Sequence, residues 1–235
     1  MCLAIFKPEN KVCPKNHLKN GFAGNDDGAG FAIAKGGKIE IYKGFFTFEE
    51  FWKAFKPYQN FPAIIHFRYA THGTVGAGNC HPFPVGKNSA MIHNGILNIQ
   101  SDETNSDTAN FANLVLDPIL KSGISENCPA LKFLVESSIG RGNKICLLNG
   151  SGECQLFNED AGTWENGVWY SNTGYKVEKR PLFDFMPKGY SNTFSDSRSN
   201  YQTWDDAEFE RQELIAEYEL NGFTRKEAEH MASAI

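Results

Sequence analysis

The sequence opens with Met1-Cys2-Leu3-Ala4-Ile5-Phe6, a short apolar run that carries a cysteine at position 2. Five apolar residues followed by a lysine are typical of a buried β-strand. Removal of the initiator methionine would leave Cys2 with a free α-amine next to its thiol. An amine with a pKa of about 8 can take a proton from that thiol. Cys2 is therefore either a small residue at the start of a strand or a catalytic nucleophile.

Further along the chain, alternation and helical spacing predict several strands and a few helices. The predicted strands are 2–6, 30–34, 38–42, 63–67, 89–93, 144–149, 153–158 and 167–171, and the predicted helices are 48–56, one that opens at Ser106-Asp107 with Pro118 near its end, and 129–138. Gly36-Gly37 should join a hairpin, residues 70–88 should form a long loop, and the last three strands should form a meander. This order indicates an α+β fold with two sheets enclosed by helices.

The bulk composition limits the classes of partner and cofactor. The 235 residues are 41% hydrophobic and 22% charged, which fits a packed domain. A net charge of -5 argues against nucleic acid as a partner, and no apolar run is long enough for a membrane span. The six cysteines form no C-x-x-C pair, and no histidine pair has zinc spacing. We expect a reduced, cytoplasmic protein with no metal and no cofactor.

The chain changes character after about residue 187. Residues 188–203 are rich in Ser, Asn, Thr and Tyr, which predicts a linker or surface loop. Residues 204–235 predict a short helical hairpin that packs on the main domain or binds a partner. The main domain is therefore expected to span 2–187.

Three segments contain further candidates for chemistry. In HFRYATHGTVGAGNCHPF, residues 66–83, Arg68 ends a strand and could hold a carboxylate in bidentate fashion, with Thr71 and His72 as extra donors. A structural ion pair is the other interpretation of Arg68. In MIHNGIL, residues 91–97, the pair Asn94-Gly95 offers a side-chain amide and an open backbone N–H, as an oxyanion hole requires.

The alternative for Asn94-Gly95 is a type I′ hairpin turn, which this dipeptide favours. In NSDTANF, residues 105–111, Asp107 could cap a helix or face the ammonium group of a ligand.

Taken in order, these pieces resemble the glutaminase domain of class II glutamine amidotransferases, which belong to the N-terminal nucleophile hydrolases. The matching pieces are Met1-Cys2, Arg68 to Gly73, Asn79-x-His81-Pro82, His93-Asn94-Gly95 and Ser106-Asp107-Thr108. The resemblance covers residues 2 to about 175 and implies a four-layer αββα sandwich of that type, followed here by the helical hairpin. Two departures stand out: Asn25, Asp26 and Asp27 occupy the place of the usual Arg-Gly pair, and Tyr69 that of the usual Trp.

The resemblance also implies a role for each matching residue. Cys2 would attack the side-chain amide of glutamine and form a thioester, with its α-amine as proton shuttle. The oxyanion would be stabilised by Asn94 and Gly95, while the substrate carboxylate would be bound by Arg68 with help from Thr71 and His72. Asp107 would bind the substrate ammonium.

Three functional hypotheses follow from this set. The first is a glutaminase that releases ammonia to a separate synthase subunit. The second is a stand-alone hydrolase of γ-glutamyl amides that uses the same thioester chemistry. The third is a catalytically idle binding module on the same fold.

Overall fold

The computed structural model describes residues 2–69, 76–99, 105–176, 224–226 and 229. The chain divides into two units, Met1–Arg180 and Pro181–Ile235. The linker predicted at 188–203 lies outside the described residues, and so does the predicted hairpin at 204–235 except for residues 224–226 and 229. Both stay predictions, and the fold described here is that of the first unit.

Two antiparallel sheets form the centre of the first unit. In the six-stranded sheet the order is β3 (Lys38–Phe45), β2 (Ala29–Lys35), β4 (Ala63–Phe67), β1 (Leu3–Lys7), β10 (Val168–Tyr170) and β9 (Thr163–Glu165). In the four-stranded sheet it is β5 (Phe83–Val85), β6 (Ser89–Asn94), β7 (Lys144–Asn149) and β8 (Cys154–Phe157). The prediction of an α+β fold with two sheets is confirmed.

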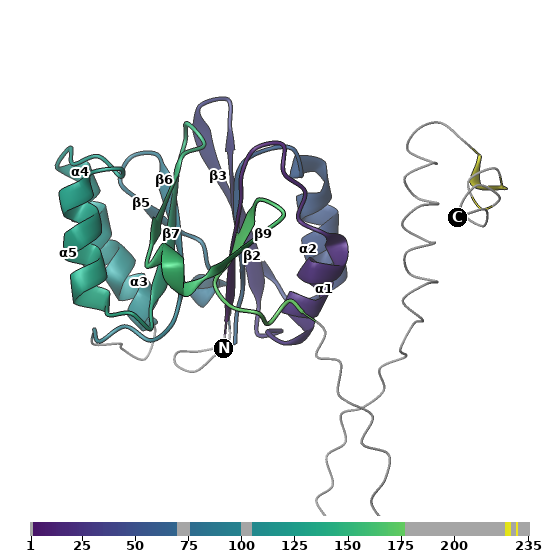
Figure 1. The fold of residues 1–235 in the computed structure, drawn as a ribbon, viewed down its shortest axis with the longest axis horizontal. Coiled ribbons are helices and arrows are strands. Elements are labelled where there is room, and N and C mark those ends of the chain that lie inside the picture. Colours follow the sequence, from purple (N-terminus) through teal and green to yellow (C-terminus); the bar gives the residue numbers. More distant parts are fainter. Residues whose placement is uncertain (1, 70–75, 100–104, 177–223, 227–228, 230–235) are drawn as a thin grey trace, which may run out of the picture. The chain divides into compact units, whose positions relative to one another are not determined.

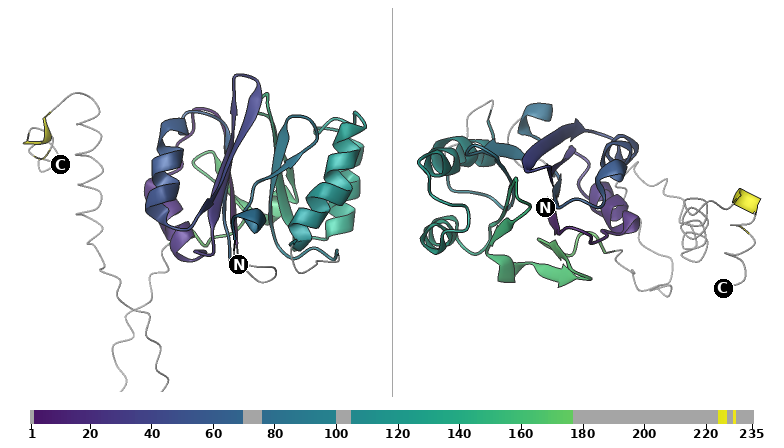
Figure 2. Two further views of the ribbon diagram at one scale, coloured as in Figure 1. Left: turned by 180° about the vertical axis from the view of Figure 1, so that it is seen from behind. Right: turned by 90° about the horizontal axis from the view of Figure 1, so that it is seen from above.

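Helices cover the outer face of each sheet (Figure 1). The helices α1 (Lys15–Ala23) and α2 (Phe48–Phe55) pack their apolar side chains on the six-stranded sheet. The four-stranded sheet is covered by α3 (Asp107–Phe111), a π-helical segment (Ala112–Leu116), α4 (Asp117–Lys121) and α5 (Pro129–Ile139). Short 3-10 turns occur at Lys56–Tyr58, Ala77–Asn79 and Glu159–Ala161. The two sheets face one another between these helices, as both views in Figure 2 show.

Small residues allow the two sheets to approach closely. The core between them contains Ala4 and Ala32 from one sheet and Ala90 from the other, beside larger side chains such as that of Trp169. All four side chains are fully buried. Close packing of this kind leaves little room for a polar group unless it has a hydrogen-bonding partner.

Strand alternation decides which side chains continue this interface toward one end. Successive residues of a strand point to opposite faces, so residues two apart share a face. Ala4 of β1, Ile64 of β4, Ile92 of β6 and Trp169 of β10 all face the core between the sheets. Toward the end of the sheets where β1 begins, the next residues on these inner faces are Cys2, His66, Asn94 and Ser171, each two positions away in its own strand. The polar residues of the site are thus on the same inner faces as the apolar core.

The predicted hairpin at 30–34 and 38–42 is confirmed, with Gly36 and Gly37 at φ values of +57° and +77° in the turn. The type I′ turn at Asn94-Gly95 is wrong. The strand that ends at Asn94 pairs with β5 and β7 rather than with the segment that follows it. A type I′ turn needs a positive φ at both central residues, and Asn94 is not among the described non-glycine residues with a positive φ.

The predicted meander is also wrong, because its third strand leaves the sheet. Strand β10 pairs with β1 and β9 in the six-stranded sheet, whereas β7 and β8 stay in the four-stranded sheet. Closeness in sequence favours a pairing of β10 with β8. Instead β10 lies between β1 and β9, where all three of its residues are buried. The strand β9 and the helix α1 were not predicted, and β5 lies inside the predicted loop at 70–88.

The helix predicted to open at Ser106-Asp107 begins as expected. Ser106 is its N-cap, since its Oγ accepts the Ala109 N–H at 3.2 Å, and Asp107 is its first residue. A cap role for Asp107 itself is therefore wrong. Pro118 lies near the end of the helical stretch, as predicted, since it follows the π-helical segment and the stretch ends at Lys121.

We expect Gly30→Ala to destabilise the fold by about 3 kcal/mol, because an added Cβ would lie 2.2 Å from the His81 carbonyl oxygen and 2.8 Å from that of Tyr42. The matched control is Gly142→Ala, an exposed position where an added Cβ meets nothing within 4 Å. Chemical denaturation of the two variants checks this. Equal stabilities would show that β2 can shift away from the His81 loop at little cost.

Candidate active site

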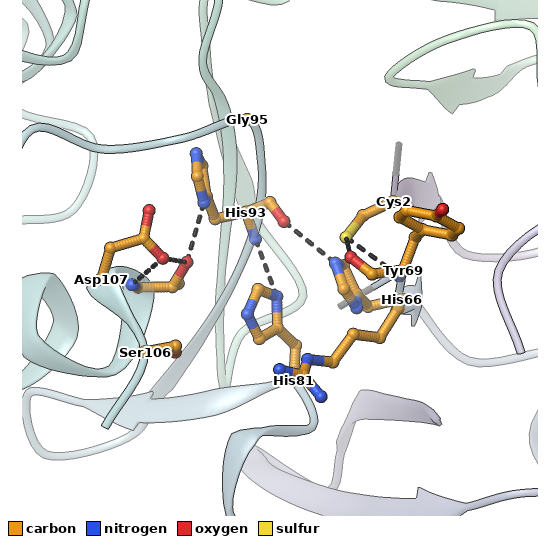
Figure 3. A pocket seen from close by; sticks show the side chains of 10 residues that line it. Cys2, His66, Tyr69, His81, His93, Gly95, Ser106 and Asp107 are labelled. Atoms are coloured by element: carbon orange, nitrogen blue, oxygen red, sulfur yellow. Dashed lines mark hydrogen bonds between the residues drawn. The ribbon is translucent and has the colours of Figure 1, made fainter. Parts of the chain in front are cut away.

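A pocket opens at the end of the two sheets where β1 begins and β6 ends. The residues that line it are Cys2, His66, Arg68, Tyr69, His81, His93, Gly95, Ser106, Asp107 and Thr108. The hollow is about 360 Å³ when counted out to open solvent. Figure 3 shows Cys2 and Tyr69 on one side, Ser106 and Asp107 on the other, and three histidines between them. Four residues predicted from the sequence thus meet here, namely Cys2, Arg68, Gly95 and Asp107.

The Cys2 thiol is held by the backbone of Tyr69. The Tyr69 N–H donates to Sγ at 3.3 Å, and Sγ lies 3.4 Å from the Tyr69 carbonyl oxygen. The Cys2 carbonyl oxygen accepts the Nδ2–H of Asn172 at 2.8 Å. These contacts follow from the register, in which Leu3 lies opposite Phe67 and the next pair brings Cys2 to the end of β4. The thiol therefore has a fixed position at the pocket wall.

Burial determines the protonation state of this thiol. Removal from water disfavours the thiolate and raises the pKa of Cys2 above its ordinary value of 9.0. The Tyr69 N–H, the positive charge of the amino terminus and the Arg68 guanidinium act in the opposite direction, but burial prevails. At neutral pH the sulfur carries its proton, so a nucleophilic attack needs a base nearby.

Arg68 is 4% exposed and follows directly after β4, on the same face as His66. Its N–H donates to the Gly28 carbonyl at 2.8 Å, and its carbonyl oxygen accepts the Asp27 N–H at 3.0 Å. The backbone of this arginine is therefore tied to the segment that precedes β2. Thr71 and His72, the predicted helpers of Arg68, lie outside the described residues.

Glycine is the only residue type that fits at position 95. With φ at +144°, an added Cβ would lie 2.2 Å from Asn143 Oδ1. Asn94 is not among the described residues that line the pocket. Its side chain is 2% exposed and donates its Nδ2–H to Ser171 Oγ at 2.7 Å. The backbone of Gly95 thus reaches the pocket surface, while the amide of Asn94 lies just behind it.

The Asp107 carboxylate anchors the chain that follows Gly95. Its Oδ2 accepts the Leu97 N–H at 2.7 Å, and its Oδ1 accepts the Thr108 N–H at 2.7 Å. Thr108 Oγ1 also lies 3.3 Å from Oδ1, while Oδ2 has a second lone pair that can still accept from a ligand. Asp107 is partly exposed at the pocket edge, at the N-terminal end of α3.

Three buried histidines connect the two sides of the pocket. The Nε2–H of His66 donates to the His93 carbonyl at 3.0 Å, and the His93 N–H donates to Nδ1 of His81 at 3.3 Å. The His66 and His81 rings lie 3.9 Å apart between centroids. The Nε2–H of His93 donates to Asn143 Oδ1 at 2.9 Å, which leaves its Nδ1 to accept from Thr108 Oγ1 at 2.8 Å.

The bonds of His81 and His93 require neutral imidazoles, because each of these rings accepts a hydrogen bond at its Nδ1. Burial lowers the pKa of His66 to about 3, with the nearby His93 adding to the effect. Burial also lowers the pKa of His81 well below its ordinary value, and it lowers the pKa of His93. A proton on His81 Nδ1 would face the N–H that this atom accepts. A proton on His66 Nδ1 would be buried without a partner among the described residues.

Strand alternation predicts the position of some pocket residues to which the sequence motifs assign no role. His66 is two residues after Ile64 and two before Arg68, so alternation alone places it on the inner face of β4. Ser171 has the same relation to Trp169 on β10. The backbone contacts of Tyr69 had no such signal, because they depend on the register between β1 and β4.

Within the described part of the chain, no group of three or more His, Cys, Asp or Glu side chains is arranged to hold a metal ion. In the same residues, no helix has the length and apolar character needed to cross a membrane.

Comparison with known proteins gave a distant structural match. No protein-family model matches the chain, and no curated protein sequence matches it. Among solved structures, glutamine phosphoribosylpyrophosphate (PRPP) amidotransferase from B. subtilis, complexed with ADP and GMP, is similar over 72% of this chain at 19% identity, with a TM-score of 0.47. The match covers 41% of that protein's chain.

The histidines make stability depend on pH in a defined window. A folded-state pKa of about 3 for His66 is below the unfolded value of 6.5, so the unfolded chain binds more protons between these limits. The stability is fully present above pH 6.5 and is lost as pH falls toward 3. We expect the free energy of unfolding to fall by up to about 1.4 kcal/mol per pH unit for His66.

The variant His66→Gln keeps an N–H donor near the Nε2 position but cannot take up the proton. Its stability, measured by urea denaturation from pH 7 to 5, should fall less steeply than that of the wild type. The control is His17→Gln at a half-buried histidine, whose pKa is lowered less strongly by burial. An unchanged slope in His66→Gln would show that His66 is not held neutral by the fold.

Proposed function

We propose that the protein is a glutaminase of the class II amidotransferase type, with the αββα arrangement of N-terminal nucleophile hydrolases. It would hydrolyse the side-chain amide of glutamine through a thioester on Cys2. The observation that carries the proposal is the convergence of Cys2, Arg68, Gly95 and Asp107 on one pocket. These residues come from four separate segments of the chain, and each has the chemistry that one part of the reaction needs.

Cys2 supplies both the nucleophile and its base. Because burial raises the pKa of the thiol, it needs a proton acceptor at neutral pH. The α-amine that removal of Met1 would create is attached to the same residue and can take this proton directly or through one water. The Tyr69 N–H, 3.3 Å from Sγ, then stabilises the developing thiolate.

The substrate would be bound by complementary charges. The Arg68 guanidinium would pair with the α-carboxylate of glutamine, with Thr71 and His72 as further donors. The Asp107 carboxylate pairs with the α-ammonium group. An aliphatic amine or an amide that lacks these two charged groups could make neither contact, which favours an amino acid as the substrate.

The reaction would then follow in balanced steps. Sγ forms a bond to the amide carbon, and the negative oxygen of the tetrahedral intermediate accepts from the Gly95 N–H and the Asn94 amide. The carbon–nitrogen bond breaks, and the leaving nitrogen takes a proton from the α-ammonium of Cys2 to depart as ammonia. Water attacks the thioester, which releases glutamate and restores the thiol.

The ammonia would be passed to a separate synthase subunit. We place the activity in the cytoplasm, since the cysteines of the chain are free thiols and the nucleophile must stay reduced.

Intact mass spectrometry and a glutamate assay test the proposal together. We expect the purified protein to lack Met1 and to gain a single adduct with a glutamine-analogue diazo-ketone. Cys2→Ala should abolish the adduct and lower glutamate release by more than about 10³-fold, because the covalent intermediate can no longer form. The binding residues alone cannot replace the thioester.

The control is Cys128→Ala, which removes another partly exposed thiol and should change neither readout. Faster turnover of γ-glutamyl conjugates than of glutamine would replace the proposed substrate but retain the thioester chemistry. Retention of Met1 together with no turnover of any amide would overturn the proposal and favour an idle binding module.

A further inference from the structure

The segment that follows β10 contacts both the oxyanion candidate and the strand of the nucleophile. The Nδ2–H of Asn94 donates to Ser171 Oγ at 2.7 Å, and the Ala4 N–H donates to the same oxygen at 2.9 Å. The Ser171 N–H in turn donates to the Ala4 carbonyl at 2.9 Å. Ser171 is 1% exposed and lies 77 residues from Asn94 in sequence. One hydroxyl oxygen therefore links the two sheets beside Cys2.

The arrangement of the strands explains why a serine can do this. Strand β10 is the neighbour of β1, with Ile5 opposite Tyr170, so the next residue along β10 reaches the backbone of Ala4. Ser171 shares the inner face of β10 with Trp169, which faces the other sheet. Asn94 is the last residue of β6 and lies on the inner face of that sheet. The small serine side chain fits between the backbone of Ala4 and the amide of Asn94, next to the Trp169 ring on the same face.

The hydrogen bond from Asn94 has a directional consequence. The terminal torsion of an asparagine is broad and nearly two-fold, so an unrestrained amide can present either its NH₂ or its oxygen to a neighbour. With one N–H directed at Ser171, the amide plane is fixed and the second N–H points away at a set angle. A rotated amide would direct its oxygen toward the negative charge of an intermediate and repel it.

We propose that Ser171 is the positioning residue that orients the Asn94 amide for stabilisation of the oxyanion. This inference rests on the proposed glutaminase function, and Ser171 itself does not touch the substrate. Asn172 reinforces the same segment, since its amide holds the Cys2 carbonyl at 2.8 Å. The end of β10 thus fixes the nucleophile and the oxyanion donor relative to one another.

A purely structural serine would act differently. If its hydroxyl only closed the end of the sheet for the Ala4 N–H, its loss would lower stability but leave the activity of each folded molecule unchanged. It would also have the same effect whether or not residue 94 carries an amide. The two roles therefore separate in a double-mutant cycle.

The cycle compares glutamate release by the wild type, Ser171→Ala, Asn94→Ala and the double variant, each corrected for the folded fraction. We expect Ser171→Ala to lower kcat by about 10- to 100-fold with KM changed less than about threefold, since the lost interaction acts on the transition state. In the Asn94→Ala background the same change should cost less than about twofold. Costs that multiply independently would overturn the inference.

A second pair of variants tests the inference even if the Ser171→Ala variant does not fold. Ser171→Thr and Ser171→Val have nearly the same shape, and only the first keeps the hydroxyl. The Thr variant should exceed the Val variant in kcat by about tenfold or more, and equal values would overturn the inference while leaving the proposed function intact. A wild type that hydrolyses no amide would overturn the proposed function, and the inference with it.

Discussion

A hydrogen bond from the buried side chain of His66 to the backbone of the opposite sheet joins the two sheets where the candidate site lies. The imidazole belongs to β4, and the carbonyl that it meets belongs to His93 of β6. Because the ring is fully buried, it can donate at Nε2 without carrying a charge. The stacked His81 ring and the backbone N–H of His93 extend this contact across the pocket floor. The two walls of the pocket are held apart at a distance that these rings determine.

The close packing of the sheets gives this arrangement its rigidity. Alanines such as Ala4 and Ala90 lie in the core between the sheets, and the Trp169 ring is fully buried beside them. At the end of β1 the small apolar residues give way to polar ones on the same faces. A pocket forms there because polar side chains need partners and cannot interdigitate as the alanines do. The pocket thus lies where the apolar core between the two sheets ends.

A feature could be predicted from the sequence when the residues that determine it lie close together along the chain. The strand at Cys2, the Gly36-Gly37 hairpin and the N-terminus of the helix at Ser106 are local and were predicted. The place of β10 beside β1 was not, because a pairing of residues more than 160 positions apart leaves no local pattern. For the same reason the orientation of the Asn94 amide could not be derived, since its partner Ser171 lies on that strand.

The position of β1 has a practical consequence for handling the protein. This strand has β4 on one side and β10 on the other, so it is an inner strand, and Cys2, the residue before it, stands at the pocket wall. Any affinity tag fused before Cys2 would have to leave the sheet beside Tyr69 and Asn172, at the entrance that a ligand would use. It would also block the α-amine as a permanent amide. Purification tags therefore belong at the carboxyl end, or must be removed so that Cys2 becomes the first residue.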